Sequence, residues 1–191
     1  MKTAIFLSCV LVGSGLLYKP ATTHTAATVA TYKVSKAKKS VAPPIAPVRI
    51  VIDKSDYELQ VYDAKGWYAT YPVVFGSNSL DDKKVEGDRK TPEGSFKIAS
   101  KRPHEKWSRM LLLDYPTPET LERFKERMRR GEIPRNASPG GGIGIHGTWP
   151  KDDFMIDRYK NWTNGCISLK NSDVQELYSY IQVGTPVTIK R

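Results

Sequence analysis

The chain has 191 residues, of which 39% are hydrophobic, 26% charged and 10% aromatic, a balance that fits one soluble domain with additional segments. Its formal net charge is +10, but residues 1–47 hold six lysines and no acidic residue, so the remainder carries only about +4. No basic stripe interleaved with aromatic residues and no recognition-helix pattern is present, so we expect no nucleic-acid partner.

The first 20 residues are predicted to be a signal peptide or an N-terminal anchor. A positive start, Met1-Lys2, precedes a mostly apolar run from Thr3 to Tyr18, which is shorter than the ~20 residues of a membrane span. We therefore expect export to the periplasm or cell envelope, with a membrane tether if the run is retained. Residues 21–47, rich in Ala, Thr, Lys and Pro, are predicted to be a flexible linker because they bury too little apolar area to offset ordering.

Residues 48–191 are expected to form the main domain. Short β-branched and aromatic runs predict strands at 48–52, 57–62, 67–75, 91–98, 110–113, 143–146 and 185–189. The pattern Thr117-Pro118 predicts the start of a helix that ends at Gly131. A second helix is predicted with Ser172 as its N-cap and Gln175 in the capping-box position.

Many short strands with two helices predict a mainly β fold, a sandwich or small barrel. Segment 101–141 contains the first predicted helix and is a candidate lid insertion over a site. The same helix pattern fits an ordinary surface helix equally well.

One thiol remains once the leader is set aside, because Cys9 falls within it. A single cysteine, Cys166, forms no intrachain disulfide, so in an exported protein it is either buried and inert or kept for its reactivity. His146 lies beside glycine after a strand-like run, and a nearby imidazole is what activates a cysteine nucleophile.

The glycines beside these residues fit a catalytic role. Gly147 lets the backbone turn, so that a main-chain carbonyl receives the Nδ1 proton of His146 and aims Nε2 at sulfur. The N–H groups of Gly165 and Cys166 are predicted to form an oxyanion hole. The alternatives are a buried core histidine and an inert buried thiol.

Metal binding and cofactors are not expected. Three aspartates lie near His146, but no second histidine or cysteine completes a ligand set for zinc. The aspartates are Asp152, Asp153 and Asp157.

The motif Ile145-His146-Gly147 followed by Thr163-x-Gly165-Cys166-Ile167 resembles the signature of the L,D-transpeptidase catalytic domain family, also called YkuD-like. The resemblance covers residues 48–191, including the Thr91–Phe96 turn. It implies a β-rich sandwich-like fold and peptidoglycan stem peptides as the partner and substrate.

The resemblance also implies residue roles. Cys166 attacks the carbonyl of a diaminoacyl residue and expels terminal D-alanine, and an amine of another stem then takes the acyl group. His146 serves as base and later as acid, the Gly147 carbonyl orients it, and the Gly165 and Cys166 amides hold the oxyanion. We also expect substrate contacts from Thr163, Asn164, Trp149 and Ser168.

Two positions depart from the family pattern. Asn164 stands where the family usually has histidine, and Ser168 where it usually has arginine or asparagine. Asn164 offers an amide to a substrate but carries no proton, so the acceptor stays open. An amine gives transpeptidation, which we expect first, whereas water gives an L,D-carboxypeptidase, or a hydrolase that undoes cross-links or releases a wall-attached protein.

Other classes of protein share parts of this pattern. A non-catalytic wall-binding module would use His146 and Cys166 structurally. Sortases need an arginine beyond the cysteine, and here only Arg191 follows. Papain-type and NlpC/P60-type peptidases place cysteine before histidine, which is the reverse order.

Overall fold

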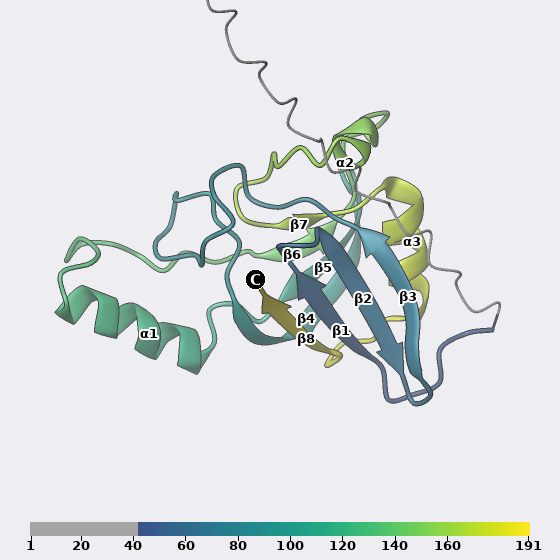
Figure 1. The fold of residues 1–191 in the computed structure, drawn as a ribbon, viewed down its shortest axis with the longest axis horizontal. Coiled ribbons are helices and arrows are strands. Elements are labelled where there is room, and N and C mark those ends of the chain that lie inside the picture. The colour runs from purple at the N-terminus through teal and green to yellow at the C-terminus, as the bar shows by residue number, and fades with distance from the viewer. Residues whose placement is uncertain (1–41) are drawn as a thin grey trace, which may run out of the picture. The chain divides into compact units, whose positions relative to one another are not determined.

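The described part of the chain, residues 42–191 of the computed structural model, is built around one eight-stranded sheet (Figure 1). The strands are β1 (Arg49–Asp53), β2 (Glu58–Asp63), β3 (Gly66–Pro72), β4 (Gly94–His104), β5 (Ser108–Leu113), β6 (Gly144–His146), β7 (Ile167–Ser168) and β8 (Pro186–Lys190). Their order across the sheet is β3-β2-β1-β8-β4-β5-β6-β7. Pairing is antiparallel except for β1 with β8 and β6 with β7, which are parallel.

The two edges of this sheet are bridged to each other. Beyond β3, Val74 and Ser168 exchange backbone hydrogen bonds of 3.0 and 2.8 Å, and Gly76 forms a further bridge with Thr163. Since β3 and β7 stand at opposite ends of the strand order, these contacts curl the sheet into a barrel-like form. The predicted mainly β, sandwich- or barrel-like fold is confirmed.

The first predicted helix is present as α1 (Pro118–Arg129). Its N-cap is Thr117, whose side-chain oxygen accepts from the N–H of Thr120 at 3.2 Å, as a threonine cap should. Gly131 follows with φ of +72°, a conformation that favours glycine. The local signals at both ends therefore predicted this helix correctly.

The second predicted helix, α3 (Asn171–Tyr180), starts differently from the prediction. Its N-cap is Lys170 without a side-chain hydrogen bond, so the predicted cap at Ser172 is wrong. Gln175 does not close a capping box, because its Nε2 donates to Ser108 Oγ at 2.9 Å. A third, four-residue helix, α2 (Phe154–Asp157), was not predicted because it is too short for a helical period.

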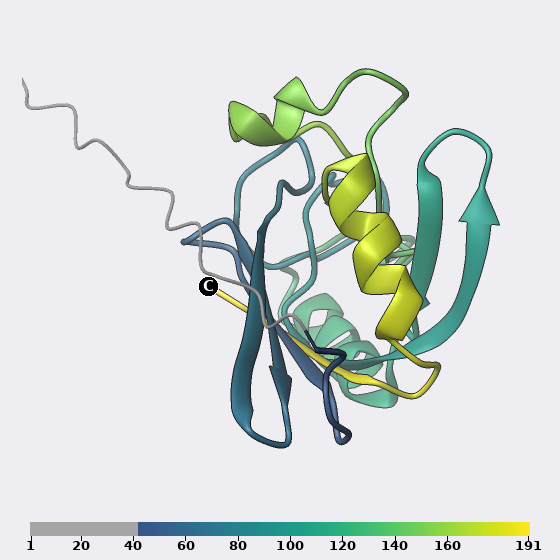
Figure 2. The same ribbon diagram turned by 90° about the vertical axis from the view of Figure 1, so that its right-hand side faces the viewer.

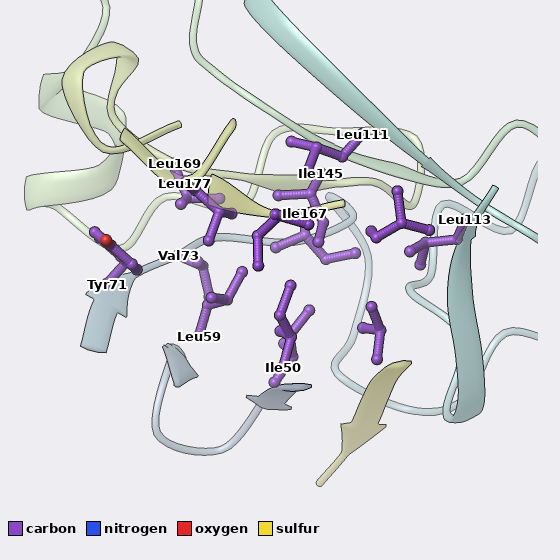
Figure 3. Packing of buried hydrophobic residues seen from close by; sticks show 14 of the residues in the cluster. Ile50, Leu59, Tyr71, Val73, Leu111, Leu113, Ile145, Ile167, Leu169 and Leu177 are labelled. Atoms are coloured by element: carbon purple, nitrogen blue, oxygen red, sulfur yellow. The ribbon is translucent and has the colours of Figure 1, made fainter. Parts of the chain in front are cut away.

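α3 lies across the curled sheet between the β2–β3 and β4–β5 hairpins (Figure 2). It is tied to β3 by the hydroxyl of Tyr71, which donates to Glu176 at 3.0 Å and lies 2.8 Å from the hydroxyl of Tyr180. The core beneath it includes Ile145 of β6 and Ile167 of β7, both fully buried (Figure 3). Burying each such side chain contributes roughly 1.5–3 kcal/mol, which fixes the two short strands in register.

Several boundaries differ from the predicted ranges. β4 runs on to His104 and forms a hairpin with β5, so residues 101–113 of the candidate lid belong to the sheet. Only residues 114–141 remain outside it, and their assignment as a lid stays a prediction. Residues 1–41, with the predicted leader and most of the predicted linker, lie outside the described residues.

The last residues of the predicted linker contact the domain. The N–H of Ile45 donates to Asp63 at 3.0 Å, and its carbonyl accepts from Ala64 at 2.9 Å. Of the helices within residues 42–191, none has the length and apolar character needed to cross a membrane.

Candidate active site

His146 is the last residue of β6 and is 2% exposed. Its Nδ1 lies 2.7 Å from the carbonyl oxygen of Gly147, and because a carbonyl only accepts, Nδ1 must carry the proton. Nε2 is therefore the basic nitrogen. Ser168 Oγ donates to the same carbonyl at 3.4 Å, so two donors share the oxygen that fixes the ring.

The environment of His146 keeps it neutral. Burial lowers the pKa of His146 to about 4, outweighing the Gly147 hydrogen bond, which raises it, while His104 lowers it further. At neutral pH the imidazole therefore stands ready to accept a proton.

Trp107, next to the tip of the β4–β5 hairpin, covers the imidazole. Its indole stacks on His146 with ring centroids 4.4 Å apart and on His104 at the same distance. The Trp107 carbonyl accepts from the N–H of Gly147 at 3.0 Å. One residue thus covers the ring face and holds the turn that orients the ring.

A polar network supports this turn from behind. Thr148 Oγ1 donates to Asp153 at 2.5 Å, and Asn171 donates to Thr148 and Asp153, each at 3.0 Å. A Cβ on Gly147 would lie 2.3 Å from Asn171 Oδ1. Only glycine therefore fits between the network and His146.

Cys166 directly precedes β7. The register pairs Ile145 with Ile167 and His146 with Ser168. Cys166 is two residues from Ser168, the strand partner of His146, so the pairing of β6 with β7 brings the two residues near each other.

The thiol of Cys166 is protonated at rest. Its Sγ donates to the Gly142 carbonyl at 3.5 Å. Burial raises the pKa of the Cys166 thiol, and a Gly144 backbone hydrogen bond and the charge of Lys83 only partly offset this. The resting pair is therefore a neutral thiol and a neutral imidazole.

The turn before Cys166 is closed by Thr163. Its buried Oγ1 accepts from the N–H of Gly165 at 3.1 Å and donates to the carbonyl of Cys166 at 2.7 Å. Thr163 is thus engaged inside the protein and the Gly165 amide has an acceptor there, and their roles toward a substrate stay predictions. The Cys166 N–H has no acceptor within residues 42–191, so it is free to donate to a ligand.

The remaining predicted contacts divide between the surface and the interior. Ser168 is fully buried, and its hydroxyl donates to the Gly147 carbonyl, so its contact with a substrate stays a prediction. Trp149 is 41% exposed and meets the edge of Trp107. Asn164 is exposed and lines a cleft of about 390 Å³.

This cleft lies next to the turn before Cys166, although neither Cys166 nor His146 is among the residues that line it. Besides Asn164 it is lined by Lys83, Glu86, Arg89, Gly140 and Ile143, among others. Ile143 lies close to Gly165, since a Cβ on that glycine would be 3.1 Å from Ile143 Cδ1. Within residues 42–191, no group of three or more His, Cys, Asp or Glu side chains could hold a metal ion.

Sequence reasoning missed Trp107 and Lys83. Trp107 lies three residues before the predicted strand 110–113, and Lys83 lies in a charged segment between predicted strands. The closeness of each to the candidate pair arises from strand pairing and loop packing over long sequence separations, and no local pattern indicates either one.

Gly165 offers a test of how tightly the turn is built. Its φ is +130°, and an added Cβ would lie 2.7 Å from the Lys90 carbonyl oxygen, so Gly165→Ala should destabilise the fold by about 1–3 kcal/mol or more. Gly87→Ala is the matched control, because Gly87 also has positive φ (+79°) but nothing within 4 Å of the added Cβ. Urea unfolding measures both, and equal losses would contradict the steric argument.

The comparisons with known proteins agree with this geometry. A family model described as the L,D-transpeptidase catalytic domain, YkuD, matches residues 47–189. The chain belongs to this family. No curated protein matches the chain.

Solved structures share the family fold. The chain is similar to the K307A mutant of the helical cell shape determining protein Pgp2 from Campylobacter jejuni, with 25% identity and a TM-score of 0.56 over 75% of this chain and 47% of that one. It is also similar to Bd1075 from Bdellovibrio bacteriovorus, with 21% identity and a TM-score of 0.52 over 75% of this chain and 47% of that one. The chain is similar as well to the Enterococcus faecium L,D-transpeptidase C442S mutant, with 17% identity and a TM-score of 0.50 over 76% of this chain and 50% of that one. The chain thus spans about half the length of these proteins.

Proposed function

We propose that this L,D-transpeptidase family member performs cysteine-dependent acyl transfer on peptidoglycan stem peptides, in cell-wall biogenesis or remodelling. The observation that carries the proposal is the parallel pairing of β6 with β7, which brings His146 near Cys166, with Nδ1 of His146 fixed on the Gly147 carbonyl. Because peptidoglycan lies outside the cytoplasmic membrane, the proposed site of action is the periplasm or cell envelope.

The proposed first step makes a thioester. Nε2 of His146 takes the proton of the Cys166 thiol, and the thiolate attacks the carbonyl carbon at the scissile bond. The N–H of Cys166 donates to the developing oxyanion. His146 then returns the proton to the leaving amine, so that the C-terminal D-residue departs.

Trp107 supports the charged intermediate of this cycle. His146 becomes an imidazolium when it holds the proton of the thiol, and a cation over an indole face is stabilised by ~0.5–2 kcal/mol. The face is already in place at 4.4 Å. In the second step His146 deprotonates an acceptor amine, which attacks the thioester and regenerates the thiol.

Hydrolysis of the same bonds is the second candidate. An ammonium acceptor must lose two protons during transfer, whereas water needs to lose only one. The amide of Asn164 cannot act as a base, so His146 is the base that the described site offers. This observation favours an L,D-carboxypeptidase, and the two reactions share every step up to the thioester.

The first experiment tests acylation. The protein is incubated with a carbapenem and weighed intact. We expect a covalent adduct on the wild type and none on Cys166→Ala. A folded wild type that forms no adduct would instead support a wall-binding module.

The second experiment identifies the acceptor. A tetrapeptide stem is supplied with and without an acceptor amine, and the products are separated by mass. Cross-linked product that requires the amine supports transfer. Free tripeptide in equal amounts under both conditions would show that water is the acceptor.

A further inference from the structure

Lys83 is a buried cation in the wall of the cleft beside Cys166. The residue is 6% exposed, and its Nζ donates to the Val85 carbonyl at 2.9 Å and to Asp88 Oδ1 at 2.8 Å. Burying an ammonium is costly unless it is paired and hydrogen-bonded. The Asp88 carboxylate therefore holds the Lys83 ammonium in place.

Asp88 is itself fixed by the loop. Its Oδ2 accepts from the N–H groups of Lys84 and Val85 at 2.7 and 3.0 Å, and its Oδ1 accepts from the N–H of Lys90 at 3.0 Å. Although burial raises the pKa of Asp88, the Lys83 and backbone hydrogen bonds lower it below the ordinary value. The carboxylate stays charged, and the ammonium is oriented before any ligand arrives.

The position of Lys83 links it to the chemistry. It lines the same cleft as Asn164 and Ile143, and its charge acts on the Cys166 thiol. An ammonium has three donors, and the two partners named above use two of them. A third donor is left for a ligand in the cleft.

The chemistry of the other wall residues narrows the choice of ligand. Arg89 adds a second, exposed cation, whereas Glu86 is an exposed anion whose backbone N–H is bound to the Ser138 carbonyl at 2.7 Å. The residues that line the cleft include two cations, Lys83 and Arg89, and one anion, Glu86, whereas Asp88, which pairs with Lys83, is not among them. The cleft therefore fits an anionic group.

We propose that Lys83 binds a carboxylate of the donor stem peptide and so makes the enzyme selective for stems with a free carboxylate near the scissile bond. The inference rests on the proposed function. The carboxylate has two sources, the C-terminus of the leaving residue and the side chain of the residue whose carbonyl is attacked. Stems amidated at one position or the other distinguish them.

The test combines variants with these substrates. Lys83→Met should lower kcat/KM for the free stem by about 10- to 100-fold, since a charge-assisted hydrogen bond is lost. For the stem amidated at the carboxylate that Lys83 binds, the kcat/KM values of wild type and Lys83→Met should agree within about threefold. Lys83→Arg should restore part of the selectivity by retaining the charge.

Lys84→Met is the matched control, because Lys84 is the exposed neighbour and pairs only at 3.5 Å with Glu132. It should leave kcat/KM for every stem unchanged. Alkylation of Cys166 by neutral iodoacetamide, which offers Lys83 no carboxylate, reports whether the nucleophile is intact in each variant.

The possible results distinguish failure of the inference about Lys83 from failure of the proposed function. If Lys83→Met loses the same factor in kcat/KM on the free stem and on both amidated stems, the role of Lys83 is structural. That result would overturn the inference but not the proposed function. If Lys83→Met does not fold, the wild type decides, because full activity on both amidated stems would likewise overturn it. A wild type that turns over no stem would remove the proposed function, and the inference with it.

Discussion

Replacing Cys166 with alanine is expected to lower stem turnover by about 10⁴-fold or more, because the proposed covalent step then has no nucleophile. Intact-mass analysis should also find no thioester during turnover. The fold should persist, because alanine at this half-buried position removes only the weak hydrogen bonds of the thiol with Gly142 and Gly144. We expect a change in unfolding free energy within about 1–2 kcal/mol.

Cys166→Ser is the companion variant, since it keeps the shape of the site but holds a far weaker nucleophile. Turnover by the alanine variant within tenfold of the wild type, with both proteins folded, would contradict covalent catalysis through Cys166.

Replacing His146 with glutamine is expected to slow acylation by about 10²–10⁴-fold, the usual contribution of a general base. Trp107 and the Gly147 turn should still bind the new side chain, so the loss should appear in the rate of acylation. In the wild type, acylation should fall as pH drops through about 4, where the buried imidazole gains a proton. Glutamine has no such proton, so the variant should lack this limb of the profile.

His146 also links stability to pH. Its pKa is about 4 in the folded protein and 6.5 as a model value, so between these values the unfolded chain binds more protons. Stability therefore rises with pH across this window and is lowest below pH 4. At about 1.4 kcal/mol per unit, the group contributes up to about 3 kcal/mol.

Urea unfolding between pH 4 and 7 measures this contribution. The wild type minus His146→Gln difference isolates it, because the other titrating groups are common to both proteins. Identical pH slopes in the two proteins would contradict a buried neutral His146.

Local chemistry explains why part of the site was predictable. His146 and Gly147 are adjacent, so the hydrogen bond from Nδ1 to the next carbonyl depends on one turn. The same holds for Thr117 as a helix cap. Where two local signals competed, the prediction was wrong. Ser172 fits a capping box, but the N-cap of α3 is Lys170, two residues earlier, and Gln175 binds Ser108 in a distant strand.

The hydrogen-bond partners and the burial of residues within the motif could be found only from the structure. The amide of Gly165 looks free in sequence, yet Thr163 Oγ1 already accepts from it. Ser168 looks like a substrate contact, yet the bridge to Val74 buries it inside the closed sheet. Each outcome depends on atoms brought in by folding, which residue spacing does not describe.

The sequence by itself determined the reactive residue types, their order, the turn glycines and most of the strands, because these depend on short-range backbone preferences and side-chain chemistry. Only the tertiary structure decided that β6 and β7 pair in parallel, that the sheet closes through Val74 and Ser168, and that Trp107 and Lys83 flank the thiol–imidazole pair. Those contacts join residues far apart in the chain, and they form only because burying one shared apolar core selects a single arrangement of the strands.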